Sequence, residues 1–299
     1  MINLYDCTTY FDEPMIMDIR FNVLNQYVKK FIVVESTYSH SGSKKKLNFD
    51  IKHYPKFKNK IEYIVMDSEP KNLINLNNAK NVDWAKRENS VMRIEHQRNE
   101  AFEAIKEANE NDFVFYSDND EIPNLKQINL NMIKEKFVIF EQKLFYYKFN
   151  LLNSRVPWYG TKGIRRKNLL SISELRNIKS RKYPFYRADT LFSKTKHISL
   201  KIIKNGGWHF SQLKTPEALE QKFLNDENHN EYDMLNFGIE KIKDMINRKI
   251  ILYDHLAKKS SFKDKHKSEF KLKPVNLDYM PDYLIQNVEK YKTWFDLDK

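Results

Sequence analysis

Two aspartates two positions apart, Asp118 and Asp120, are the residues of this 299-residue chain best placed for chemistry. They directly follow residues 113–116, a run of strand-favouring side chains. Open α/β sheets bind their ligands where strands end, and residues two apart in extended chain point the same way. Two carboxylates that share one target repel each other, which favours a bound cation such as Mn²⁺ or Mg²⁺. The diphosphate of a sugar nucleotide would supply the remaining oxygen ligands.

The same aspartates also fit an acidic turn that is exposed to water at the start of a helix, because Asp and Glu are favoured there. A second charged residue is equally open to two interpretations. Arg98 lies on the apolar stripe of a helix predicted at residues 84–109. It either faces the metal and diphosphate or pairs with a carboxylate in the core, since an unpaired buried charge is costly.

The elements that position these residues follow from the hydrophobic pattern. Strands are expected at residues 2–7, 31–36, 61–66 and 113–117, with helices at 14–28 and 84–109. This order predicts an α/β fold with a mostly parallel central sheet flanked by helices. The glycine motifs of dinucleotide-binding proteins and P-loop NTPases are absent from the sequence, which argues against both classes.

The second half of the chain has weaker patterns. Residues 137–140 and 143–149 are expected as two strands, and residues 171–196 as a surface loop. A helix begins at Pro216, and a basic amphipathic helix is predicted at residues 239–258. We therefore expect a catalytic domain at residues 1–236 and, packed on it, a helical C-terminal extension at residues 237–299.

A histidine follows paired glycines at Gly206-Gly207-Trp208-His209. Glycines let the backbone approach a ligand closely, so His209 could bind a metal or donate a hydrogen bond to a phosphate. A histidine between aromatic residues also fits an ordinary core position. Both interpretations stay open on the residues alone.

Charge and cysteine content limit the class of protein. Lys and Arg number 52 against 40 Asp and Glu, which gives a net charge of +12. Such an excess suits phosphate-bearing partners: a nucleotide diphosphate, a nucleic acid or an anionic membrane. The single cysteine, Cys7, excludes an intramolecular disulfide and a cysteine-based zinc site. No run of residues approaches the roughly 20 apolar positions of a membrane span, so we expect a cytoplasmic protein that could contact the inner face of a membrane peripherally.

Together these motifs resemble glycosyltransferase family 17, the family of the bisecting β-1,4-mannosyl-glycoprotein β-1,4-N-acetylglucosaminyltransferase. The resemblance spans roughly residues 2–250 and depends on the order and spacing of several motifs. These motifs are Tyr5-Asp6-Cys7, Glu13, Arg20, residues 31–37 with His40-Ser41-Gly42, Arg87-Glu88, Arg98, residues 117–123 and residues 207–211.

The resemblance implies a GT-A-type nucleotide-sugar transferase fold, a UDP-sugar donor such as UDP-GlcNAc, a divalent metal (Mn²⁺ or Mg²⁺) and inversion at the anomeric carbon. The acceptor would be a glycan or a lipid-linked glycan, and a nucleic-acid partner is not expected. Under this interpretation the metal ligands would be Asp118, Asp120 and His209. Further residues of the donor site would be Glu35, Ser36, Thr37, Arg98 and Lys222.

Inverting transfer also needs a base that takes the proton of the acceptor hydroxyl. The candidates are Glu121, Asp226 and Glu227, with Glu121 first because it is nearest to the aspartate pair.

Two other functions use the same residues. A metal-dependent nucleotidyl or phosphoryl transferase could use the aspartate pair, and it would release UMP and a sugar phosphate rather than UDP. A basic nucleic-acid-binding protein would explain the charge and the aromatic content. The basic residues are scattered and form no recognised binding motif, which disfavours that function.

Overall fold

The computed structural model describes residues 2–225, 229, 232, 238–257 and 265–297. The strands are β1 (Leu4–Tyr10), β2 (Lys30–Ser36), β3 (Ile61–Met66), β4 (Phe113–Tyr116), β5 (Glu121–Pro123), β6 (Phe137–Tyr146), β7 (Leu151–Arg165), β8 (Leu200–Ile203), β9 (Gly207–Ser211) and β10 (Lys273–Pro274). The helices are α1 (Pro14–Leu24), α2 (Val82–Ala104), α3 (Ile172–Asn177), α4 (Pro216–Asn225), α6 (Ile239–Asn247) and α8 (Asp282–Gln286).

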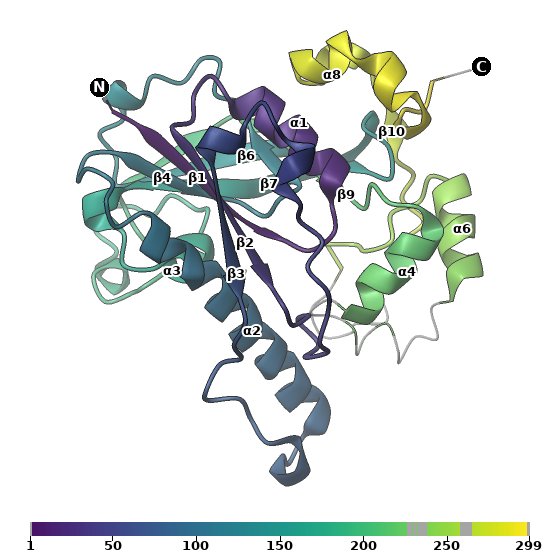
Figure 1. Cartoon of the computed structure of the whole chain (residues 1–299), viewed down its shortest axis with the longest axis horizontal. Helices are drawn as coiled ribbons and strands as arrows, with labels where there is room; N and C mark the ends of the chain where they lie inside the picture. The colour runs from purple at the N-terminus through teal and green to yellow at the C-terminus, as the bar shows by residue number, and fades with distance from the viewer. Residues whose placement is uncertain (1, 226–228, 230–231, 233–237, 258–264, 298–299) are drawn as a thin grey trace.

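All the described strands belong to one ten-stranded sheet in the order β3-β2-β1-β4-β7-β6-β9-β5, with β8 beside β6 and β10 beside β7. Helices flank this sheet, and α2 projects beyond its end (Figure 1). The expected α/β class with a central sheet and flanking helices is confirmed, and the arrangement is consistent with a GT-A-type fold.

The first half of the sheet is parallel, as the sequence predicts. Strand β1 pairs in parallel with β2 and β4, and β2 pairs in parallel with β3. Helix α1 begins at the predicted Pro14. Helix α2 begins at Val82, where the side chain of Asn81 accepts a hydrogen bond from the Trp84 amide at 3.0 Å, and it ends at Ala104, earlier than residue 109.

The second half of the sheet contains both parallel and antiparallel pairs. Strand β7 is antiparallel to both β4 and β6, and β5 is antiparallel to β9. The two strands expected at residues 137–140 and 143–149 are one strand, β6. Its pairing with β7 shifts register twice, between Ile139 and Glu141 and between Gln142 and Leu144. These irregularities interrupt the alternating pattern, so one strand has the sequence signature of two.

The sheet must curl, because β4 and β5 are joined by residues 117–120 alone while β7, β6 and β9 lie between them. Four strand spacings in a flat sheet would span about 19 Å, whereas a linker of this length reaches roughly 17 Å when fully extended. Gly207 allows β5 to approach β9 closely: its φ is +131°, and a Cβ there would lie 2.2 Å from the Ile122 carbonyl oxygen. The curl brings the acidic loop back against the sheet.

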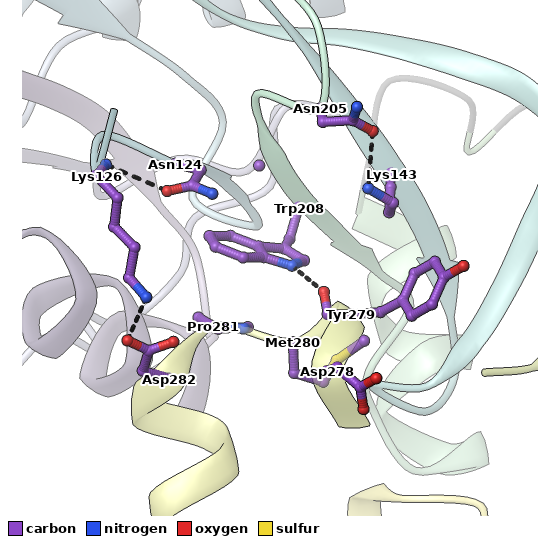
Figure 2. A pocket seen from close by; sticks show the side chains of 11 residues that line it. Asn124, Lys126, Lys143, Asn205, Trp208, Asp278, Tyr279, Met280, Pro281 and Asp282 are labelled. Atoms are coloured by element: carbon purple, nitrogen blue, oxygen red, sulfur yellow. Dashed lines mark hydrogen bonds and ion pairs between the residues drawn. The ribbon is translucent and has the colours of Figure 1, made fainter. Parts of the chain in front are cut away.

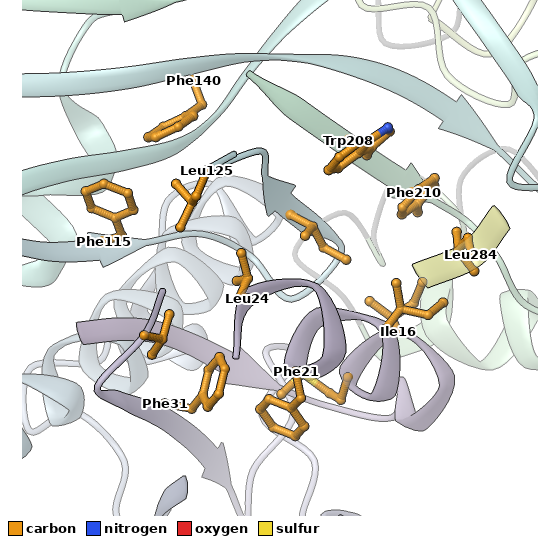
Figure 3. Close-up of a cluster of buried hydrophobic side chains, with 14 of the residues drawn as sticks. Ile16, Phe21, Leu24, Phe31, Phe115, Leu125, Phe140, Trp208, Phe210 and Leu284 are labelled. Atoms are coloured by element: carbon orange, nitrogen blue, oxygen red, sulfur yellow. The ribbon is translucent and has the colours of Figure 1, made fainter. Parts of the chain in front are cut away.

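Helix α1 and the sheet enclose a buried aromatic cluster (Figure 3). It contains Phe21 of α1, Phe115 of β4, Phe140 of β6 and Phe210 of β9, and Leu284 of α8 packs into the same cluster. The C-terminal segment therefore shares the main core, and it also adds strand β10 to the sheet beside β7. The predicted domain boundary at residue 236 lies outside the described residues and stays a prediction.

None of the helices in the described part of the chain is both long enough and apolar enough to cross a bilayer.

Candidate functional site

The acidic motif lines a pocket of about 280 Å³ where β1 and β4 end. Five of the residues expected to bind donor or metal line it together: Arg98 of α2, Asp118, Asp120, His209 of β9 and Lys222 of α4. They come from four separate parts of the chain. The fold thus gathers two carboxylates, an imidazole and two long cationic side chains around one cavity.

Two arginines hold Asp118. Its Oδ2 atom lies 2.6 Å from Nη2 of Arg176, and its Oδ1 atom lies 3.4 Å from Nη2 of Arg98. The Tyr116 hydroxyl also donates to Oδ1 at 3.1 Å. Burial alone would raise the pKa of Asp118, but the charges of Arg176 and Arg98 outweigh burial and hold this pKa well below its usual range. Asp118 is therefore ionised, and its charge is already compensated by the protein.

Asp120 pairs with His209. Its Oδ2 atom lies 3.4 Å from Nε2 of His209, and the Phe210 amide donates to its carbonyl oxygen at 2.8 Å. Burial raises the pKa of Asp120, whereas His209 and the charge of Lys222 together lower it, and the net shift is downward. The ring of His209 packs on Trp158, with 4.5 Å between centroids, and its buried Nδ1 atom has no hydrogen-bond partner among the described residues. The exposed part of the pair is small, because the Asp120 side chain is 14% exposed and the His209 side chain 9%.

The donor atoms of this pair fit a divalent metal in part. Among the described residues, no group of three or more His, Cys, Asp and Glu side chains could hold a metal ion by itself. Asp120 and His209 can supply two ligands, and phosphate oxygens and water commonly complete the coordination of such ions. Asp118 is a poorer candidate for direct coordination than expected, because its oxygens accept from Arg98, Arg176 and Tyr116.

Glu121, the first candidate for the general base, does not line the pocket. Its side chain is fully buried. The Oε1 atom accepts from Trp158 Nε1 at 2.6 Å and from Arg176 Nη2 at 2.9 Å, and the Oε2 atom accepts from the Asp118 amide at 3.1 Å. These partners favour a structural role in which Glu121 shapes the acidic loop.

Glu35 is also buried behind the pocket rather than in its wall. Its Oε1 atom accepts from Lys45 Nζ at 2.5 Å and from the Asn48 amide at 2.8 Å, and its Oε2 atom accepts from the Phe49 amide at 3.0 Å and the Tyr63 hydroxyl at 2.8 Å. Glu35 therefore fixes the loop that follows β2. The Lys45 that it holds does line the pocket.

Ser36 and Thr37 likewise lie outside the lining. The Ser36 hydroxyl accepts from the Tyr38 amide at 3.0 Å, and the Thr37 hydroxyl donates to Asp67 at 2.6 Å. The next residues of the loop, Tyr38 and His40, reach the pocket instead. Burial lowers the pKa of His40 to about 4, so this imidazole is neutral at pH 7. That this loop borders the donor site stays a prediction. The loop residues that line the pocket are Tyr38 and His40 rather than Ser36 and Thr37.

Helix α4 brings Lys222 to the pocket, and its last residue, Asn225, accepts a hydrogen bond from the Ser41 amide at 3.4 Å. The end of α4 therefore lies at the loop that follows β2. The other two candidates for the base, Asp226 and Glu227, follow directly in the sequence and lie outside the described residues.

Arg176 was not identified from the sequence, although it bridges Asp118 and Glu121. It lies on α3, within residues 171–196, where a surface loop was expected. The sequence does contain a signal for this helix: Ser171 caps it, with its hydroxyl accepting from the Glu174 amide at 3.0 Å, as in a capping box. The short length of α3 hid its periodicity.

A second buried arginine, Arg20, donates hydrogen bonds to the two ends of the acidic loop. Arg20 of α1 is fully buried and binds both carboxylate oxygens of Asp6, at 2.6 and 2.8 Å. It also donates to the Ser117 hydroxyl at 2.8 Å and to the Glu121 carbonyl at 2.9 Å. The loop between β4 and β5 is thus tied to the first helix.

A second cavity, of about 500 Å³, lies on the other face of β9 (Figure 2). Trp208 lines it, and this indole donates to the Tyr279 carbonyl at 2.6 Å. Consecutive strand residues point to opposite faces, so Trp208 and His209 serve different cavities. In this second cavity Lys126 pairs with Asp282 and no residue of the acidic motif is present. The residues expected to bind the donor therefore line the first pocket and not the second.

The decisive comparison is with protein families: the model of glycosyltransferase family 17 matches residues 2–296. The chain belongs to glycosyltransferase family 17. The resemblance seen in the sequence is confirmed, and the protein is a glycosyltransferase. No curated protein matches this family 17 enzyme.

Several solved structures are similar to this glycosyltransferase at low identity. HddC from Yersinia pseudotuberculosis is 10% identical, and the match covers 69% of this chain and 92% of the HddC chain with a TM-score of 0.33. A glycosyltransferase involved in glycosylation of the major capsid of PBCV-1 is 11% identical, with coverage of 68% and 80% and a TM-score of 0.26. The 2-C-methyl-D-erythritol 4-phosphate cytidylyltransferase of Francisella tularensis is 12% identical, with coverage of 75% and 99% and a TM-score of 0.26.

Proposed function

We propose that this enzyme transfers a sugar, GlcNAc, from its UDP-sugar to a hydroxyl of a glycan, with inversion at the anomeric carbon and with Mn²⁺ or Mg²⁺. One observation supports this proposal above the others. The pocket at the strand ends combines the ionised carboxylate of Asp120 and the imidazole ring of His209 with the cationic Arg98 and Lys222. A metal and a diphosphate need that combination of oxygen or nitrogen ligands and positive charge.

In the proposed reaction the acceptor oxygen forms a bond to the anomeric carbon while the bond from that carbon to the diphosphate breaks. UDP leaves with the bonding electrons, and the hydroxyl proton passes to a carboxylate. Arg98 and Lys222 would offset the charge that grows on the leaving diphosphate. A divalent metal, when bound by Asp120 and His209, would supply further positive charge there.

The base is proposed to be Asp226 or Glu227. Both follow α4, whose end contacts the loop after β2. The buried Glu121 already accepts three hydrogen bonds, which makes it the weaker candidate. A loss of kcat with unchanged donor binding in Asp226→Asn or in Glu227→Gln would identify the base.

The donor is tested by thermal unfolding with a panel of nucleotide sugars, with and without Mn²⁺. At a ligand concentration of about ten times Kd, binding stabilises the folded state by ~1.4 kcal/mol, which raises Tm by about 2 °C for a chain of this size. We expect that rise with UDP-GlcNAc and Mn²⁺ and no rise with ADP-sugars. If no nucleotide sugar raises Tm, the donor site proposed here is wrong. Release of UMP and a sugar phosphate would instead indicate a nucleotidyl transferase.

Replacing Arg98 by Ala is expected to weaken UDP binding about tenfold or more, because a charge-assisted hydrogen bond contributes roughly 1.5 to 3 kcal/mol. The change in Tm should be small, because Arg176 still compensates the charge of Asp118. Calorimetric titration with UDP measures the affinity.

A matched control for this variant lies on the same helix. Lys86 is a basic residue of α2 and is not part of the pocket lining. Lys86→Ala should leave UDP affinity unchanged. If Arg98→Ala lowers Tm strongly and UDP affinity stays at the wild-type value, Arg98 is a structural partner of Asp118 and not a donor ligand.

A further inference from the structure

Four large apolar side chains are exposed together in the loop between α3 and β8. Phe185 is 85% exposed, Tyr186 73%, Leu191 76% and Phe192 90%. Single exposed apolar residues are normal on protein surfaces, but a cluster of them marks an interaction site. The rings of Phe185 and Tyr186 contact each other, with 5.7 Å between centroids.

The loop has a defined base. The Lys179 amide donates to the Thr195 carbonyl at 2.7 Å, which joins its two ends. Inside it, buried Thr190 donates to the Arg187 carbonyl at 2.6 Å. The loop is therefore closed at its base, and Phe185 and Phe192 are exposed to solvent. We call residues 179–196 the apolar-basic loop.

Positive charge accompanies the apolar side chains. Asp189 is the one acidic residue of the apolar-basic loop, and it pairs with Arg187 at 2.7 Å and Lys196 at 2.9 Å. The basic residues of the loop are Lys179, Arg181, Lys182, Arg187, Lys194 and Lys196. A surplus of cations therefore surrounds the exposed aromatic and aliphatic groups.

We propose that the apolar-basic loop docks this enzyme on the surface of an anionic lipid bilayer. Interfacial lipid-binding segments combine exposed Phe, Tyr and Leu with Lys and Arg, because the apolar groups enter the headgroup region and the cations attract anionic lipids. A surface for another folded protein would need no such surplus of one charge. The loop has both properties of such segments: exposed apolar side chains and a surplus of basic residues.

The C-terminal region is the other candidate for a membrane contact, because a basic amphipathic helix is predicted at residues 239–258. Helix α6 ends at Asn247, and its apolar residues Ile242 and Met245 are buried in a cluster with Leu219 of α4. The apolar face of α6 is therefore used inside the protein. The apolar-basic loop keeps its apolar groups exposed.

Sedimentation with vesicles tests the proposal. The full-length protein is mixed with vesicles of phosphatidylcholine alone or of phosphatidylcholine and phosphatidylserine, at low and at high salt. We expect binding to the anionic vesicles, weaker binding at high salt, and a loss of about tenfold or more in Phe185→Ser/Phe192→Ser. Arg181→Gln/Lys182→Gln should weaken binding about tenfold or more at low salt.

Matched controls remove exposed apolar and basic side chains elsewhere on the protein. Trp84 and Met132 are also exposed, at 55% and 66%, so Trp84→Ser/Met132→Ser tests apolar loss outside the loop. Lys52→Gln/Lys56→Gln removes two exposed charges outside it. Both control variants should bind vesicles like the wild type, and all variants should keep the wild-type Tm.

Two results would overturn the proposal. One is absence of binding to both kinds of vesicle. The other is binding that Phe185→Ser/Phe192→Ser leaves unchanged. If vesicles are not bound and the protein forms a dimer that the same double variant dissociates, the loop is a self-association surface instead. The thermal response to UDP-GlcNAc is a separate measurement, so failure of either proposal leaves the other to stand.

Discussion

Asp120→Ala is expected to abolish sugar-nucleotide turnover while Tm stays close to the wild-type value. The side chain is 14% exposed in the pocket and its ionic partner is His209. The backbone hydrogen bond from Phe210 to the carbonyl of residue 120 does not involve the side chain, so the loop keeps its shape. Loss of a group that stabilises charge in the transition state typically lowers kcat by about 10² to 10³. Release of UDP from UDP-GlcNAc in the presence of Mn²⁺ measures the effect.

Two further variants make this result specific. Asp120→Asn keeps the size of the side chain and removes its charge, so it should be inactive as well. Asp278→Ala removes an exposed carboxylate of the second cavity and should keep full activity. Activity of Asp120→Ala that still depends on Mn²⁺, together with a normal melting curve, would contradict the assigned role.

Arg20→Met should have the largest effect on stability, a loss of about 3 to 5 kcal/mol, because removal of one partner of a buried ion pair leaves the other charge uncompensated. Asp6 would stay in the core without its guanidinium, and the Ser117 hydroxyl and Glu121 carbonyl would each lose a donor. Urea unfolding at neutral pH, followed by tryptophan fluorescence, measures the change in the free energy of unfolding.

A double variant separates the cost of an orphaned charge from the value of the pair. Arg20→Met/Asp6→Leu removes both charges and should recover part of the lost stability. The control is Arg248→Met, which breaks an exposed pair with Asp244 and should leave the urea midpoint unchanged. An Arg20→Met protein with the wild-type midpoint would show that the buried pair does not stabilise the fold.

Local sequence signals predicted much of the fold. The apolar run before Asp118 and Asp120 correctly placed the acidic pair at the end of β4, and β3 matches its predicted bounds. These elements are recognisable because their pattern lies within a few consecutive residues. The mixed pairing of the second half was not predictable in this way, because antiparallel and parallel neighbours have similar patterns in buried strands.

The roles of individual carboxylates were harder to predict than their location. Glu35 lies at the end of a strand and Glu121 directly follows the aspartate pair, which are positions expected for site residues. Both side chains are nevertheless buried, and both accept hydrogen bonds from distant parts of the chain. Glu121 meets Trp158 and Arg176, and Glu35 meets Tyr63. Sequence spacing does not reveal which carboxylate receives such donors and which one stays open to a ligand. Arg176 was missed because α3, at six residues, is too short to show a helical period.

The curl of the sheet has a consequence for the order in which the protein can be built. The acidic motif leads into β5, and β5 pairs with β9, where Glu121 lies opposite His209. A ribosome synthesises the motif well before it synthesises residues 207–211. A nascent chain that ends before β9 therefore has the aspartates but neither their histidine nor the strand that holds their loop. The pocket can form only after most of the catalytic chain has emerged, so a prematurely terminated product would be unable to bind the donor as the complete enzyme does.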